Sequence, residues 1–186
     1  MVMLRNVLLS ALVGAAVMSL TGCASNPPSA ATISNIDAMS VQALDSLTSN
    51  NAAARAIAGK SRAVLIFPSI MKAGFVLGGA YGEGELRRGS EVAGYYSTFT
   101  GSWGLQAGAQ SYGYAVFLMT KEAEDYALAA DGWEIGVGPT VVVVNQGLAE
   151  NISSMTLQDD AYAFIFDQKG LMASISIEGT KITRIK

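Results

Sequence analysis

The sequence of 186 residues contains no histidine, one cysteine, four prolines and few charged residues. Without histidine, the chain lacks the commonest general base and the commonest zinc ligand. A single cysteine excludes an internal disulfide and a thiolate metal cluster. Charged residues make up 15% of the chain, whereas roughly 25% is usual for a soluble domain. The hydrophobic content of 51% excludes intrinsic disorder, and the length suits one domain.

The motifs that could carry catalysis are incomplete. Gly101–Gly104 is one residue shorter than a nucleophile elbow, and the chain has no histidine to activate Ser102. Glu83 and Glu85 would share one face of a strand, but such alternating acidic residues are more often solubility devices. The chain is acidic and lacks a basic, aromatic-rich stretch for nucleic acid. We therefore expect no enzyme activity, no cofactor, no metal and no nucleic-acid partner.

The first residues have the pattern of an export signal. Arg5 is followed by an uncharged apolar run, Val7–Leu20, which is too short to span a bilayer comfortably. The run ends in Leu20-Thr21-Gly22-Cys23, which resembles the bacterial lipobox. The resemblance implies cleavage before Cys23 and lipid attachment, for instance of palmitate, to its thiol. The alternative is that Cys23 is the last residue of an ordinary signal.

The residue after the cysteine is Ala24, and no aspartate stands there. By resemblance to lipoprotein sorting, we expect a lipid-anchored protein on the periplasmic face of the outer membrane, with surface exposure as an alternative. Multiple acyl chains would hold the protein firmly at a membrane. The predicted organisation is a signal peptide (1–22), a lipidated cysteine with a flexible tether (23–32), and a single domain (33–186).

Helices are predicted before a long run of glycine-interrupted strands. Apolar spacing favours helices at Ile33–Leu47 and Asn51–Ala58, and Thr120 is a plausible N-cap for Lys121–Ala129. The predicted strands are Ala63–Phe67, Phe75–Tyr81, Glu83–Arg88, Val92–Phe99, Gly104–Ala109, Tyr114–Met119, Trp133–Val137, Val141–Val144, Ala161–Phe166, Leu171–Ile177 and Ile182–Ile185. A hairpin turn is expected at Glu178–Lys181. This order predicts an α+β fold, with N-terminal helices packed on a strongly curved or barrel-like, mainly antiparallel, glycine-rich sheet.

The charges are unevenly distributed along the chain. Basic residues dominate from Arg55 to Arg88, and acidic residues dominate from Lys121 to Asp167. A basic face could bind the phosphate oxygens of anionic lipid. The candidates for head-group binding are Lys60, Arg62, Lys72, Arg87 and Arg88. The alternative is an ordinary solvated charge distribution.

Several segments, read in order, resemble the SYLF domain family. The segment Ala63–Phe75 (AVLIFPSIMKAGF) resembles the family's VFP-x-x-x-KAGF signature, with Lys72 as the motif lysine. Further matching segments are Gly78–Gly84, Gly104–Gln110, Trp133–Pro139, Tyr162–Leu171 and Ser176–Gly179. The resemblance extends from about Ile33 to the C-terminus. It implies structural roles for Phe67, Pro68, Gly74, Gly78, Gly79, Gly82, Gly84, Gly138, Pro139, Glu178 and Gly179.

The resemblance implies a lipid-binding, membrane-associated module. Eukaryotic members suggest phosphoinositide binding through a basic N-terminal segment, and some suggest actin binding. The first predicted helix departs from that pattern, because Ile33–Leu47 carries Asp37 and Asp45 and no basic residue. We therefore expect non-catalytic binding of anionic phospholipid at a membrane.

Two alternatives to this lipid binding stay open. One is an interaction lipoprotein that binds an envelope or host protein, an actin-like partner by family resemblance. The other is a closed barrel that encloses an apolar ligand. A contiguous basic patch would favour lipid binding, whereas a large exposed apolar patch without clustered cations would favour a protein partner.

Overall fold

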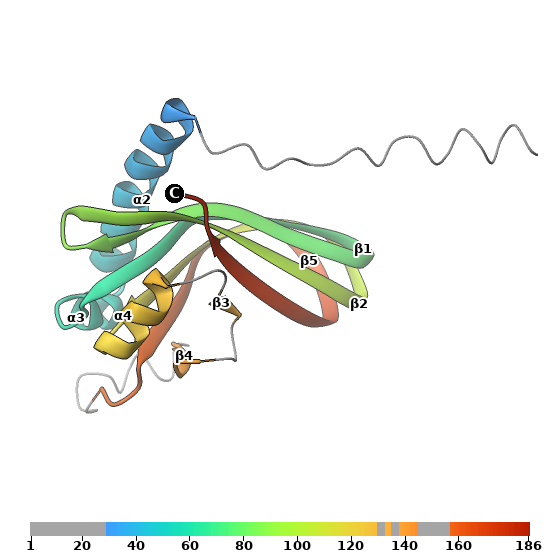
Figure 1. Cartoon of the computed structure of the whole chain (residues 1–186). Helices are drawn as coiled ribbons and strands as arrows, with labels where there is room; N and C mark the ends of the chain where they lie inside the picture. Colours follow the sequence, from blue (N-terminus) through green and yellow to red (C-terminus); the bar gives the residue numbers. More distant parts are fainter. Residues whose placement is uncertain (1–28, 130–132, 135–137, 145–156) are drawn as a thin grey trace, which may run out of the picture.

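The computed structural model describes residues 29–129, 133–134, 138–144 and 157–186. The helices are α2 (Ala30–Asn50), α3 (Ala52–Ala58) and α4 (Lys121–Leu128). The strands are β1 (Ala63–Arg88), β2 (Glu91–Leu118), β3 (Trp133–Glu134), β4 (Val141–Val143) and β5 (Ala161–Arg184), and Figure 1 shows how helices and strands are arranged.

Each helix begins at a side-chain cap. The hydroxyl of Ser29 accepts a hydrogen bond from the backbone N–H of Thr32, and the side chain of Asn51 accepts one from Ala54. The hydroxyl of Thr120 caps α4 by accepting from the N–H of Ala123, as the sequence predicted. The helices thus start where short polar side chains satisfy otherwise unpaired backbone donors.

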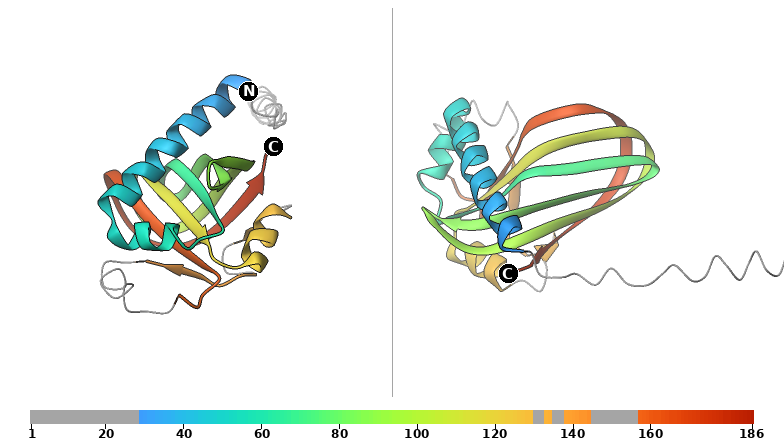
Figure 2. Two further views of the ribbon diagram at one scale, coloured as in Figure 1. Left: turned by 90° about the vertical axis from the view of Figure 1, so that its left-hand side faces the viewer. Right: turned by 90° about the horizontal axis from the view of Figure 1, so that it is seen from above.

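The sheet is built on three long antiparallel strands, with β2 between β1 and β5. The short strands β3 and β4 both pair with β5, β3 antiparallel and β4 parallel. Figure 2 shows that β1, β2 and β5 bend together, so the sheet folds back on itself. We call the bend the apex and define it as residues 73–81, 99–109 and 171–177. The opposite end, where the helices pack, is the open end.

Close backbone contacts show how tightly the sheet is folded. A side-chain Cβ at Gly84 would lie 2.1 Å from the carbonyl oxygen of Ile66. These residues are 18 apart in one strand, so a straight strand would separate them by roughly 60 Å. Gly108 has φ +130° and its Cβ would lie 2.3 Å from the carbonyl oxygen of Leu171. Only glycine fits at these two positions.

The open end contains two apolar cores, one on each face of the sheet. Leu65 and Phe67 point into the folded sheet, where they pack with Leu86, Tyr96 and others. Val64 and Ile66 alternate with them and pack beneath α2 and α3. This double burial explains why the segment from Ala63 to Phe67 is continuously apolar.

The expected α+β class and the strongly curved, mainly antiparallel sheet are confirmed. The predicted strand boundaries are wrong, because β1, β2 and β5 each continue through glycines that were expected to end strands. The predicted hairpin turn at Glu178–Lys181 is also wrong. These residues lie inside β5 and pair with Phe99–Ser102 of β2. A turn does form at Gly89, which has φ +59° between β1 and β2.

Candidate functional site

The three strands carry no charged residue where they form the apex. Charged residues are absent from positions 73–82, 92–120 and 170–177. The chain has 27 charged residues, so they concentrate in the helices, the open end and the connections. The apex is therefore a region of the surface that can leave water without desolvating an ionised side chain.

The polarity of the sheet is inverted at the apex. Along β2, the buried side chains that face inward are polar, namely Thr98, Thr100, Ser102 and Gln106. The large apolar side chains face outward and are 60–89% exposed, namely Phe75, Leu77, Phe99, Trp103 and Leu171. A sheet in water usually has the opposite arrangement, with apolar residues inside and polar residues outside. The apex thus presents an unusual apolar surface to its surroundings.

A hydrogen-bond network inside the bend supports this arrangement. The hydroxyl of Ser102 donates to Oε1 of Gln106 at 3.0 Å. The Gln106 amide donates to the carbonyl oxygens of Val76 and Ser102, both at 3.2 Å. Val76 has φ +66°, which is a strained conformation for a β-branched residue. Gln106 therefore stabilises the bulge that places Phe75 and Leu77 on the outer surface.

The five predicted head-group residues do not form one exposed patch. Lys72 and Arg87 are buried, while Lys60 is exposed at the turn after α3. The Arg87 guanidinium donates to Glu85 at 2.5 Å and to the carbonyl oxygen of Ser90 at 2.9 Å. Of the set, the structure brings together Arg62, which immediately precedes β1, and Arg88, the last residue of β1.

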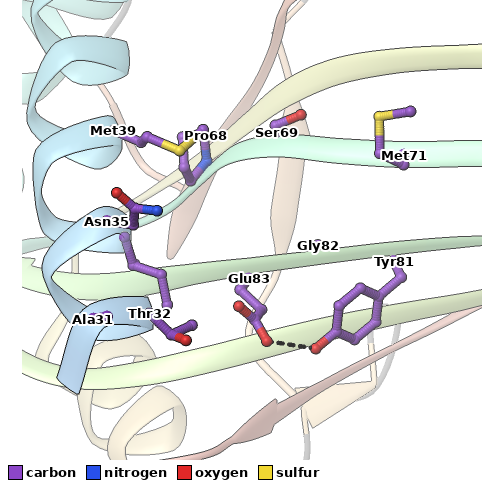
Figure 3. Close-up of a pocket in the computed structure, with 11 residues that line it drawn as sticks. Ala31, Thr32, Asn35, Met39, Pro68, Ser69, Met71, Tyr81, Gly82 and Glu83 are labelled. Carbon is purple, nitrogen blue, oxygen red and sulfur yellow. Dashed lines mark hydrogen bonds between the residues drawn. The ribbon is translucent and has the colours of Figure 1, made fainter. Parts of the chain in front are cut away.

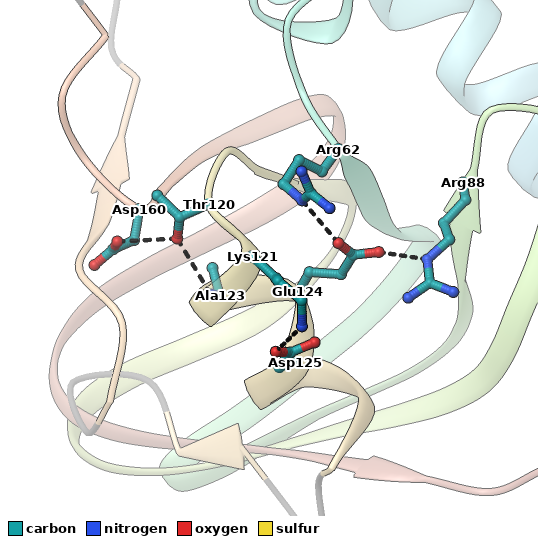
Figure 4. A network of polar contacts seen from close by, with 8 residues as sticks. All are labelled: Arg62, Arg88, Thr120, Lys121, Ala123, Glu124, Asp125 and Asp160. Atoms are coloured by element: carbon teal, nitrogen blue, oxygen red, sulfur yellow. Dashed lines mark hydrogen bonds and ion pairs between the residues drawn. The ribbon is translucent and has the colours of Figure 1, made fainter.

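Arg62 and Arg88 meet at a buried carboxylate of α4 (Figure 4). The Nε atom of Arg62 donates to Glu124 at 2.9 Å, and the Nε atom of Arg88 donates to the other oxygen. Burial acts to raise the pKa of Glu124, but the two arginines outweigh it and lower the pKa. The cluster joins α4 to both ends of β1. It lies at the open end, away from the apex.

A second buried carboxylate, Glu85, lies beneath α2, although the sequence indicated a solvated acidic residue at this position. The side chain of Glu85 is fully buried and its Oε2 atom has no hydrogen-bond partner among the described residues. Burial raises its pKa to about 7; Arg87 opposes this shift and Asp37 of α2 adds to it. Asp37 also accepts a hydrogen bond from the Tyr95 hydroxyl at 2.9 Å. No sequence signal distinguished the fully buried Glu85 from the partly buried Glu83, because the difference arises from how α2 packs on β1.

A groove of about 430 Å³ runs between α2 and β1. Figure 3 shows Met39, Pro68 and Met71 on one side of the groove and Thr32, Asn35 and Glu83 on the other. The Tyr81 hydroxyl donates to Oε1 of Glu83 at 2.8 Å. The pKa of Tyr81 is raised to about 12, mainly by burial and, to a smaller extent, by the hydrogen bond to the Glu83 carboxylate and its negative charge. The residues come from positions 31–39 and 68–83, so only the fold brings them together.

Most of the other predicted residues have structural roles in the fold. One of them, Cys23, lies outside the residues that the structure describes, so its lipidation stays a prediction. Phe67 is buried in the inner core and Pro68 lines the groove. The backbones of Glu178 and Gly179 pair with Ser102 and Gly101 at the edge of the apex.

The remaining motif glycines lie on β1 or next to α4. The glycines at 74, 78, 79, 82 and 84 all lie in β1. At each of them except Gly79, a side-chain Cβ would lie less than 3 Å from a neighbouring atom. Gly138 has φ +95° and lies against the Tyr126 ring, with Pro139 following it.

The described residues contain neither a candidate membrane-spanning helix nor a metal-binding cluster. None of the described helices has both the length and the apolar character needed to cross a membrane. Within the same residues, no group of three or more Cys, Asp or Glu side chains is placed to hold a metal ion.

Comparison with known proteins supports the resemblance found in the sequence. The family model Ysc84, described as Las17-binding protein actin regulator, matches residues 99–186. The matched region contains most of β2, α4 and all of β5, including the part of the apex that carries Phe99 and Trp103. No curated protein matches the chain.

Proposed function

We propose, from the premise that residues 99–186 belong to the Ysc84 (SYLF) domain family, that this chain is a non-catalytic module that binds a phospholipid membrane. The apex is the surface that meets the lipid. Residues 1–22 act as a lipoprotein signal, and acylation of Cys23 tethers the domain to the outer membrane at its periplasmic face.

The inverted polarity of the apex is the observation that carries this proposal. Phe75, Leu77, Trp103 and Leu171 face outward from three neighbouring strands. Full transfer of one such side chain out of water contributes about 1.5–3 kcal/mol. The transfer of several such side chains together offsets the entropic cost of holding the domain at a membrane surface. Tryptophan and phenylalanine are also suited to the boundary between lipid head groups and acyl chains.

A membrane suits this surface better than a protein partner does. The apex is convex, and its outer face lacks charged residues across all three strands. Most protein interfaces have a polar rim that supplies specific hydrogen bonds, whereas a lipid surface requires no fixed complementary shape. The description of the family as Las17-binding actin regulators supports the alternative, a protein partner. Insertion of Trp103 into vesicles distinguishes the two.

The preference for anionic lipid depends on a different part of the molecule. Arg62 and Arg88 are about half exposed and lie at the open end. One flat membrane does not contact both the apex and this cluster, because they occupy opposite ends of the folded sheet (Figure 1). We therefore expect apex binding to depend weakly on lipid charge and on salt.

Trp103 fluorescence tests the proposal in the full chain. Trp133→Phe leaves Trp103 as the single tryptophan. Vesicles of phosphatidylcholine, with and without phosphatidylglycerol, should shift Trp103 emission to the blue, and brominated acyl chains should quench it. Because this signal arises at the apex, it reports apex insertion even if the N-terminal segment also binds lipid.

Paired substitutions identify the surface. Phe75→Ser with Leu77→Ser should weaken the vesicle-induced signal about ten-fold or more, since two large apolar side chains no longer leave water. Val41→Ser, at an exposed apolar position of α2, is the matched control and should change little. Sedimentation with vesicles without any change in Trp103 emission would overturn the proposal. Binding confined to anionic vesicles and lost in salt would assign the lipid contact to the cations instead.

A further inference from the structure

We propose that the groove between α2 and β1 binds one phospholipid molecule with a primary ammonium head group. The inference rests on the proposed membrane function, because the bilayer would supply this lipid. The groove adjoins the apex at Tyr81 but makes a different kind of contact. The apex meets the bilayer as a whole, whereas the groove holds a single amphiphile.

The acyl chain would lie along the apolar side of the groove. Met39 of α2 and Pro68 and Met71 of β1 lie on this side (Figure 3). Ile36 of α2 also lines the groove. Methionine side chains are flexible and polarisable, and they adapt to a chain that has no fixed conformation. The groove has a volume of about 430 Å³, within the roughly 300–1,000 Å³ of typical small-molecule sites.

The groove borders the apex through β1, which gives a lipid a path of entry. Met71 and Tyr81 line the groove, and both are more than half exposed on the outer face of β1. Met71 is four residues before Phe75, and Tyr81 is four residues after Leu77, at the end of the apex segment of β1. A lipid beside the inserted apex can therefore move its chain into the groove without crossing water.

The polar side of the groove determines the head group. Glu83 is the one carboxylate among the described residues that line the groove, and no described lining residue is basic. The Tyr81 hydroxyl donates to Oε1 of Glu83 at 2.8 Å, which fixes the carboxylate near the first turn of α2 (Figure 3). A carboxylate in this position attracts an ammonium group and repels a free fatty acid or an anionic head group. Thr32 and Asn35 add neutral hydrogen-bonding groups.

Soluble single-chain lipids test the site without a bilayer. The full chain, labelled at its methionine methyl groups, is titrated with short-chain lysophosphatidylethanolamine and, separately, with lysophosphatidylglycerol. The Met39 and Met71 methyl signals, assigned by Met→Leu variants, should shift with the first lipid at lower concentration than with the second. Glu83→Gln should weaken binding of the ammonium lipid about five-fold, the effect of one part-exposed ion pair, and should remove the preference.

Two further variants separate the groove from the apex. Asn35→Phe fills the groove from an exposed helix position and should abolish the methyl shifts, whereas Gln42→Phe, an exposed α2 position outside the groove lining, should retain them. Both should retain the Trp103 signal with vesicles. Phe75→Ser with Leu77→Ser should lose that signal but still bind the lysolipid. Failure of membrane binding and failure of the groove site are therefore distinguishable.

Three outcomes would overturn the assignment. Equal binding of both lysolipids would remove the role of Glu83 in selecting an ammonium group. Shifts confined to methionines outside the groove would place the lipid elsewhere. Contacts from Met39 or Met71 to residues before Ser29, with no displacement by lysolipid, would identify the N-terminal segment of this chain as the occupant.

Discussion

The stability of the domain should fall as pH rises from about 4.5 to about 7, because Glu85 is buried beneath α2. Its pKa is raised from 4.5 to about 7 in the folded state. Between these values the folded chain keeps a proton that the unfolded chain has released. The stabilisation is complete below the unfolded pKa and is lost as pH passes through the folded pKa.

The size of the effect follows from the size of the pKa shift. One pKa unit corresponds to about 1.36 kcal/mol, so the free energy of unfolding should decrease by about 3 kcal/mol across this window. Glu124, whose pKa is lowered, acts in the opposite direction, but only at more acidic pH. The chain contains no histidine, so the group that most often titrates near pH 6.5 is missing. Glu85 should therefore dominate this window.

Urea unfolding of the full chain at a series of pH values from 4.5 to 8 measures the slope. Glu85→Gln should flatten it, because a glutamine has no proton to lose. Glu83→Gln is the matched control: it lies two residues away in the groove wall, is more exposed, and should keep the wild-type slope. Stability that is constant or increases from pH 5 to 7.5 would refute the reasoning, as would identical slopes in the two variants.

Two further predictions concern the folding of the sheet onto itself. Gly84→Ala should destabilise the chain by about 3 kcal/mol or more, because the new Cβ would lie 2.1 Å from the Ile66 carbonyl oxygen; Gly101→Ala, whose Cβ has no neighbour closer than 3.9 Å, should be tolerated in the same thermal-unfolding assay. Gln106→Leu should cost about 2 kcal/mol by leaving the Ser102 hydroxyl and the Val76 carbonyl without this partner. Gln168→Leu, at an exposed β5 position, is its control, and equal losses would contradict the assigned role of Gln106.

The sequence predicted the fold class and the local starts of the helices because those depend on nearby residues. Thr120 caps α4 through a contact three residues away, and such patterns are visible in a single chain. Strand ends were harder to predict. Gly74, Gly78, Gly104 and Gly108 are typical of turns, yet here they lie within two paired strands at a shared bend. The cause is a close approach between strand segments that are distant in sequence.

The candidate sites depended even more on long-range packing. The alternation Thr98-Phe99-Thr100 indicates a strand with one polar face, but it does not say which face points outward. Lys72 and Arg87 are buried, whereas Arg62 and Arg88 stay about half exposed and meet at Glu124 of α4. Which cation is buried depends on how segments distant in sequence pack together. The groove joins α2 to two distant parts of β1. None of these outcomes has a local signal in the sequence.

The geometry of the apex also explains why its exposed apolar residues indicate a functional surface. At Gly78 the inside of the bend has no space for a side chain, since a Cβ there would lie 2.6 Å from Oε1 of Gln106. Where the structure describes side chains in the bend, the inner face holds glycine and small or mutually hydrogen-bonded polar residues. The outer face has no such restriction, and lysine or glutamate would fit there at little cost to folding. Folding therefore does not require Phe75, Leu77 and Trp103 on that face, whereas an apolar partner such as a lipid bilayer would.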